Sequence, residues 1–162
     1  DETLASYLGK ELLRTESTIA FAESCTGGLA SSLVTDVPGS SEYLLGSAVT
    51  YSNMAKHKLI NVSEESLEAY GAVSWQVACE MAQGVRELFG TTYGVGITGI
   101  AGPGGATEDK PVGLVYMAVA DADGVKWAKH IFGGTRTDNK MRSALTAISM
   151  VIDRIKEKRN GE

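Results

Sequence analysis

Short apolar runs alternate with helical patterns along most of this chain, and this alternation constrains the fold more than any other feature. Runs rich in β-branched and aromatic residues predict strands at 17–22, 44–52, 92–102, 112–120 and 125–132. Apolar residues at helical spacing predict helices over 3–15, Leu29–Val37, 53–60, a segment that starts near Ser63, Val77–Phe89 and Met141–Ile155.

Strands that alternate with helices are joined by right-handed crossovers, which cover both faces of the sheet. Asp123-Gly124 is a hairpin signal between the last two strands. We therefore predict one α/β domain over residues 1–162, a three-layer α/β/α sandwich. Its mixed sheet should be mostly parallel, with about five strands and an antiparallel hairpin.

Composition narrows the classes of function. The 162 residues carry a net charge of −5 without a long basic run, so we expect no direct binding of nucleic acid. No run of about 20 apolar residues occurs, so we expect no membrane contact. The two cysteines are far apart and the two histidines belong to no metal-ligand cluster. These features favour a reducing, cytoplasmic setting and a site without metal or cofactor.

Ligands of such folds bind beyond the carboxyl ends of the strands. Three segments rich in glycine or hydroxyl groups fall there, at 23–28, 51–56 and 98–107. Their convergence is the main functional signal that the residue pattern gives.

Ser24 lies in "AESCTGG", where a predicted strand turns into a predicted helix. As a nucleophile it would have helix-start amides nearby to stabilise an oxyanion, and Gly27 and Gly28 would let a substrate approach the backbone. Alternatively, Ser24 or Thr26 only caps the helix and the glycines only permit close packing.

A serine nucleophile needs a base. Lys56, 32 positions further on in "TYSNMAKHKL", can serve if a cleft holds its amine neutral. Tyr51 is either a core residue or a hydroxyl that assists this pair. Another interpretation makes Cys25 the nucleophile and His57 its base.

The segment "GITGIAGPGGATEDKPVG" (96–113) is long enough to embrace a ligand rather than only connect two strands. Arg136 precedes a predicted helix start with Thr137 or Asp138 as the cap, which is suited to holding a phosphate. Arg142 is the alternative for that role.

Four segments resemble the C-terminal domain of competence/damage-inducible protein A, the CinA family: "AESCTGG" (22–28), "TYSN..AK" (50–56), "GIAGP" (99–103) with "KPVG" (110–113), and "GAVS" (71–74). The resemblance covers residues 4–155. Met54 departs from it, since a glutamate is expected at this position.

Active members of that family are nicotinamide-nucleotide amidases. The resemblance implies hydrolysis of nicotinamide mononucleotide (NMN) to nicotinic acid mononucleotide and ammonia, which recycles a pyridine nucleotide. It makes Ser24 the nucleophile, Lys56 the base and Tyr51 an assisting hydroxyl. Substrate would contact the remaining predicted residues: Glu23, Cys25, Thr26, Gly27, Gly28, Thr98, Gly99, Ala101, Gly102, Arg136 and Arg142.

The family also contains inactive paralogues. The alternative function is therefore a non-catalytic module that binds a ligand or a protein and is linked to competence or DNA damage. As partners we expect a small nucleotide substrate and further copies of this chain in a homo-oligomer.

Overall fold

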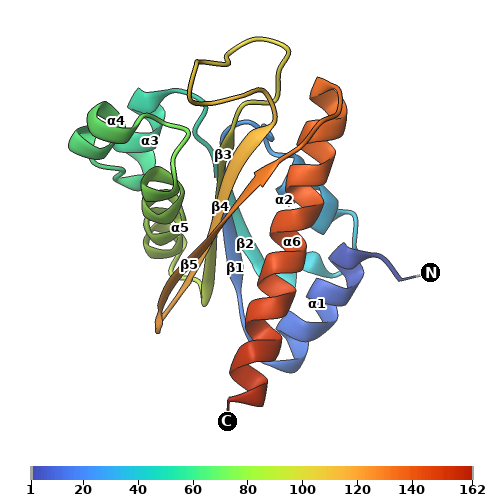
Figure 1. Cartoon of the computed structure of the whole chain (residues 1–162). Coiled ribbons are helices and arrows are strands. Elements are labelled where there is room, and N and C mark those ends of the chain that lie inside the picture. The colour runs from blue at the N-terminus through green and yellow to red at the C-terminus, as the bar shows by residue number, and fades with distance from the viewer. Residues whose placement is uncertain (1, 162) are drawn as a thin grey trace.

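The computed structural model describes residues 2–161 as one five-stranded sheet with helices on both faces (Figure 1). The strands are β1 (Ile19–Glu23), β2 (Leu44–Val49), β3 (Tyr93–Gly99), β4 (Leu114–Asp121) and β5 (Gly124–Ile131). The helices are α1 (Leu4–Arg14), α2 (Leu29–Thr35), α3 (Asn53–Ile60), α4 (Glu64–Tyr70), α5 (Trp75–Phe89) and α6 (Arg136–Asn160), with a 3₁₀ turn at Ser40–Glu42.

The strand order is β2-β1-β3-β4-β5. β1 is parallel to both β2 and β3, whereas β4 is antiparallel to its neighbours β3 and β5. Four of the five strands therefore point the same way, and β4 and β5 form the predicted hairpin. The predicted three-layer α/β/α sandwich with a mostly parallel mixed sheet is confirmed.

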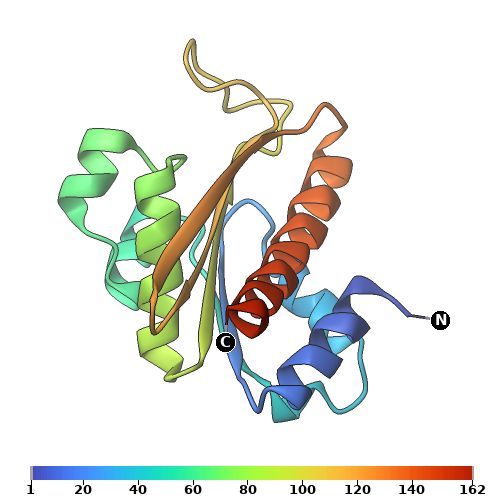
Figure 2. The ribbon, with the colours of Figure 1, turned by 60° about the horizontal axis from the view of Figure 1, so that its bottom comes forward.

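Each face of the sheet has its own group of helices (Figures 1 and 2). α1, α2 and α6 cover one face, and α3, α4 and α5 cover the other. Four of the five residues of β1 are apolar because both faces of the strand are buried: Phe21 packs into the core under α6, while Ala20 and Ala22 pack into the core under α5. A strand buried on both faces has no polar alternation.

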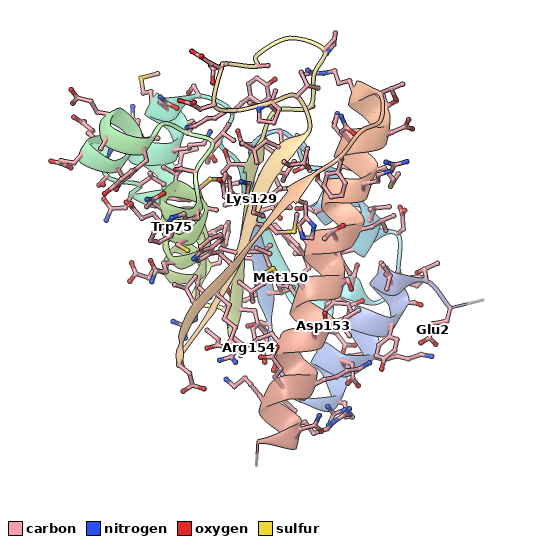
Figure 3. The ribbon with its side chains drawn as sticks, viewed as in Figure 1. Glu2, Trp75, Lys129, Met150, Asp153 and Arg154 are labelled. Carbon is pink, nitrogen blue, oxygen red and sulfur yellow. The ribbon has the colours of Figure 1, made fainter. Side chains whose placement is uncertain are left out.

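α5 lies very close to β3 because two strand residues lack side chains. A Cβ at Gly96 would overlap the carbonyl oxygen of Ala78, and one at Gly94 would overlap that of Ala82. At the outer edge of the same layer, the Trp75 ring stacks on the Trp127 ring of β5, with 5.3 Å between ring centroids (Trp75 is labelled in Figure 3).

Most predicted elements are present, and the predicted helix over 53–60 matches α3 at both ends. The last helix is longer than its apolar stripe, because its first turn is polar. The predicted cap at Thr137 or Asp138 is wrong: Thr135 is the N-cap, its hydroxyl accepts a bond from the Asp138 amide, and the Asp138 carboxylate accepts one from the Thr135 amide.

The topology gathers the ends of the parallel strands at one edge of the sheet. The segments that follow β1, β2 and β3 all leave at this edge, at the top of Figure 1, where α6 also begins. The loop from Ile100 to Gly113 stands above it. Among residues 2–161, none of the helices combines the length and apolarity needed to span a bilayer.

Candidate active site

Ser24 and Lys56 meet at this edge. Ser24 is the first residue after β1, and Lys56 lies in the first turn of α3, which the Ser52 side chain caps. The Lys56 amine Nζ is 2.9 Å from Ser24 Oγ, and the lysine side chain is fully buried. The structure thus joins two residues that the sequence separates by 32 positions.

The surroundings of Lys56 favour a neutral amine. Burial lowers the pKa of the Lys56 amine to about 8, because the ammonium form loses its hydration. The other contacts of Nζ are neutral carbonyl oxygens, those of Thr50 at 2.6 Å and Tyr51 at 3.4 Å. Within the described chain, none of the ion pairs includes Lys56.

The turn that carries Ser24 needs glycines for its backbone. The Ser24 amide donates to Ile97 O of β3, and the Gly27 amide donates to Ser24 O. Gly27 and Gly28 have φ angles of 62° and 102°, in the left-handed region that side chains disfavour. Their role in the structure is therefore to turn the chain sharply after Ser24.

The helix-start amides that we expected to be free are occupied. The Glu23 carboxylate, fully buried, accepts bonds from the Ala30 and Ser31 amides at 2.9 Å each and from the hydroxyls of Thr26 and Ser31 at 2.6 Å each. Gly28 is the N-cap of α2, without a side-chain cap bond. Neither Ser24 nor Thr26 caps this helix, because Glu23 takes that function across seven residues.

The Cys25–His57 pair is not formed. Burial raises the pKa of the Cys25 thiol to about 12, and Cys25 packs into the core beneath the turn. His57 lies on another face of α3, where Nδ1 contacts Val62 O at 2.8 Å and Nε2 lies 3.1 Å from the Glu64 carboxylate. Met54, at the position where we expected glutamate, is 74% exposed on α3, away from Ser24 and Lys56.

A cavity of about 370 Å³ opens beside the Ser24–Lys56 pair. Its basic lining residues are Lys56 and Arg136, and its lining includes no carboxylate. The full lining consists of Ser24, Cys25, Tyr51, Lys56, Ala72, Val73, Thr98, Gly99, Ile100, Ala101, Gly102, Gly104, Gly105 and Arg136. A comparable cavity of about 390 Å³ between α5 and the β4–β5 turn contains none of the predicted site residues.

Arg136 connects three parts of the cavity rim. As the first residue of α6, it sends Nη1 to Gly102 O at 2.7 Å and Nη2 to the Tyr51 hydroxyl at 3.1 Å. Tyr51 is 63% exposed, so it is not a core residue. Its hydroxyl contacts Arg136, and its assisting role in catalysis stays a prediction.

Most of the predicted site residues line this cavity, but five do not. Glu23, Thr26, Gly27 and Gly28 build the turn behind Ser24, and Arg142 is exposed on α6.

Four further lining residues were not among the predicted site residues: Ala72, Val73, Gly104 and Gly105. "GAVS" (71–74) pointed toward the first two of these. The Thr98 hydroxyl fixes this segment by donating to Ala72 O at 2.8 Å.

Comparisons with known proteins agree on one family. The model described as "CinA C-terminal domain" matches residues 1–155. A "CinA-like protein" of Endomicrobium trichonymphae is 48% identical over 151 residues, 93% of this chain and 35% of that protein. Another of Salinibacter ruber (strain DSM 13855 / M31) is 50% identical over 148 residues, 91% of this chain and 36% of that protein. The chain thus spans little more than a third of these relatives.

Solved structures show the same fold. The crystal structure of competence/damage inducible protein CihA from Agrobacterium tumefaciens is 38% identical with a TM-score of 0.90, covering 93% of this chain and 92% of that chain. A CinA superfamily protein from Klebsiella pneumoniae 700603 is 25% identical with a TM-score of 0.92, covering 95% and 96%.

Proposed function

This chain belongs to the family of CinA C-terminal domains, and from that premise we propose that it is an amidase that hydrolyses NMN to nicotinic acid mononucleotide and ammonia. The observation that carries the proposal is the 2.9 Å contact between the buried Lys56 amine and Ser24 Oγ. A hydroxyl beside a neutral amine is an activated nucleophile, and a carboxamide is an acyl group that it can attack.

The hydrogen-bond partners of Lys56 support its role as the base. A neutral amine has two N–H bonds and one lone pair. The carbonyl oxygens of Thr50 and Tyr51 can accept hydrogen bonds from the two N–H groups. The lone pair is then available to accept the Ser24 hydroxyl proton, as general base catalysis requires.

The reaction needs two acyl transfers. Ser24 Oγ bonds to the carboxamide carbon while its proton passes to Lys56 Nζ. The C–N bond breaks, Lys56 returns the proton to the departing amine, and ammonia leaves. Water then attacks the acyl ester and gives a proton to Lys56. The ester bond breaks as that proton returns to Ser24 Oγ, releasing the acid.

The oxyanion of each tetrahedral intermediate requires N–H donors near Ser24. The α2 amides of Ala30 and Ser31 serve Glu23 instead. In residues 2–161, no backbone carbonyl accepts a hydrogen bond from the Cys25 or Thr26 amide. We assign the oxyanion to these two amides of the turn.

The phosphate of NMN fits the charge of the cavity. Arginine has five N–H donors, and Arg136 uses two of them on Gly102 O and the Tyr51 hydroxyl. The others are available for a bound anion, and with no carboxylate in the lining the cavity favours a negatively charged ligand. We assign the 5′-phosphate of NMN to Arg136.

The direct test is release of ammonia from NMN by the purified protein, with the pyridine product identified by chromatography. We expect nicotinic acid mononucleotide, and no turnover by Ser24→Ala. NMN that binds but is not hydrolysed by the wild-type protein would contradict the amidase and support the alternative of a ligand-binding module.

A further inference from the structure

We propose that Asn139 is a positioning residue, which fixes one wall of the cavity to the start of α6 and thereby holds Arg136 in place for the substrate phosphate. The proposal rests on the proposed function for the identity of the ligand. Asn139 was not among the predicted site residues, and it does not line the cavity.

Both the NH₂ group and the oxygen of the Asn139 carboxamide form hydrogen bonds inside the protein. Asn139 is 1% exposed. Its Nδ2 donates to Ala101 O at 3.0 Å and to Gly134 O at 3.1 Å, and its Oδ1 accepts the Gly134 amide at 3.0 Å. The orientation of the amide group follows from these partners, because two carbonyls require the NH₂ and one N–H requires the oxygen.

These bonds join two segments that are distant in sequence. Ala101 belongs to the wall after β3, and Gly134 lies two residues before Arg136, outside α6. Two side chains from the first turn of α6 hold consecutive carbonyls of that wall: Asn139 holds Ala101 O and Arg136 holds Gly102 O. The position of the guanidinium therefore depends on the Asn139 bonds.

Gly134 contributes to this arrangement by its lack of a side chain. A Cβ there would lie 2.7 Å from the Asp138 Cβ and 3.2 Å from Asn139 Oδ1, so the capping turn closes over the Asn139 amide only with glycine. The start of α6 is thus built around the Asn139 side chain, as well as around the Thr135 cap.

The test uses Asn139→Asp, which keeps the shape and one acceptor but removes both N–H donors. The carbonyl oxygens of Ala101 and Gly134 would then lie against a carboxylate oxygen, which cannot donate a hydrogen bond to them. We expect KM for NMN to rise by about tenfold or more, as for the loss of buried hydrogen bonds near a charged contact. KM for nicotinamide riboside, which lacks the phosphate, should change by less than about threefold.

Asn160→Asp, at the exposed far end of α6, is the matched control and should behave as the wild type. Asn139→Ser is a second variant that adds no charge, and it should shift KM in the same direction. A KM increase of equal size for both substrates, or no KM change in a folded Asn139→Asp protein, would overturn the proposal.

A double-mutant cycle tests whether Asn139 acts through Arg136. Adding Asn139→Asp to Arg136→Ala should raise KM for NMN by less than about threefold, because the contact that Asn139 positions is already gone. A full additional tenfold increase would show that Asn139 acts through some other route.

Binding to the inactive Ser24→Ala protein separates this proposal from the proposed function. Calorimetry with NMN should show the same loss of affinity for Asn139→Asp, whether or not the wild-type protein turns NMN over. If NMN does not bind, the substrate assignment fails. Hydrogen exchange then decides on Asn139: the amides of Ile100 and Gly113, which are bonded at the base of the wall, should exchange faster in Asn139→Asp than in Asn160→Asp, and equal rates would refute the proposal.

Discussion

Lys56 is the residue whose surroundings say most about the chemistry. A lysine side chain without exposure is rare unless a partner compensates for the lost hydration, and here the partners are a serine hydroxyl and two carbonyls. This environment sets the protonation state of the Lys56 amine, and under the proposed mechanism it also sets the pH range of the reaction.

The rate of ammonia release should therefore increase with pH. Burial lowers the pKa of Lys56 to about 8. Below this value the amine is protonated and cannot accept the Ser24 proton, and above it the amine is free. We expect kcat/KM to rise about tenfold per pH unit well below pH 8 and to level off above it. A profile that is flat across this range would exclude Lys56 as the titrating base.

Lys56→Arg should abolish turnover although it keeps the positive charge. The guanidinium stays protonated at every working pH and cannot act as a base. Lys56→Ala should be equally inactive, which separates the loss of the base from crowding by the larger side chain. Lys58→Arg, exposed on the same helix, is the matched control. Substantial activity in a folded Lys56→Arg protein would reduce Lys56 to a fixed charge.

Ser24→Ala and Cys25→Ala should differ sharply. Removal of the nucleophile should lower kcat by at least about a thousandfold. Cys25→Ala should keep activity within about tenfold, because the pKa of about 12 leaves almost no thiolate at neutral pH. Single-turnover kinetics and circular dichroism on both variants provide the measurement. An active Ser24→Ala protein with an inactive, folded Cys25→Ala protein would reverse the assignment.

At the scale of elements, the site depends on how closely α5 lies on β3. Thr98 reaches Ala72 O because the segment that contains Ala72 leads directly into α5, and α5 packs on bare backbone at Gly94 and Gly96. Gly94 and Gly96 of β3 therefore affect the site indirectly, because they let α5 pack closely enough to place Ala72 beside Thr98.

Gly96→Ala should destabilise the protein by about 1–3 kcal/mol, since the added methyl group overlaps the Ala78 carbonyl and the neighbouring helix backbone. Gly133→Ala is the matched control, because a Cβ there has no neighbour within 4 Å and its φ is not positive. Chemical denaturation compares the two. Equal stability would mean that α5 shifts away without cost.

Helices and strands were predicted well where a short stretch of sequence carries the whole signal. The predicted helix over 53–60 matches α3, and Asp123-Gly124 predicted the hairpin correctly. The true cap at Thr135 was missed because it precedes a polar first turn outside the apolar stripe. The role of Asn139 was missed for another reason: its side chain bonds to Ala101, 38 positions away, whose place depends on the whole fold.

The Ser24–Lys56 pair was predicted because crossover topology brings strand ends together, whereas its 2.9 Å distance follows only from packing.

At the scale of the whole molecule, α6 links the site to the opposite end of the sheet. Its 25 residues span roughly 37 Å. Arg136 lies at one end, and near the other the Arg154 guanidinium donates to the buried Asp121 carboxylate at 2.8 Å (Arg154 is labelled in Figure 3). The predicted homo-oligomer stays a prediction.

Asp121→Ala should lower the free energy of unfolding by about 3 kcal/mol at neutral pH, because it leaves Arg154 without its buried partner. Burial alone would raise the pKa of Asp121, but bonds from Arg154 and the Asp123 amide lower it overall. The ion pair therefore stabilises the fold above the unfolded pKa, and this contribution disappears as pH falls through the native value.

The difference between wild type and Asp121→Ala should accordingly shrink in acid, as calorimetry at two pH values would show. KM for NMN should not change at temperatures where both proteins are folded. A difference in stability that is independent of pH would contradict the ion-pair explanation.

The cavity draws its two ends from different stretches of the chain. Ser24 and Lys56, the residues assigned to catalysis, come from residues 24–56. The walls and the Arg136 guanidinium, which face the rest of the ligand, come from residues 72–136. Side chains of the second stretch can therefore change while Ser24 and Lys56 are kept, provided that Arg136, which contacts Tyr51, is also kept. Under the proposed amidase function, variant libraries confined to the second stretch should accept new amides while Ser24 and Lys56 still carry out the hydrolysis.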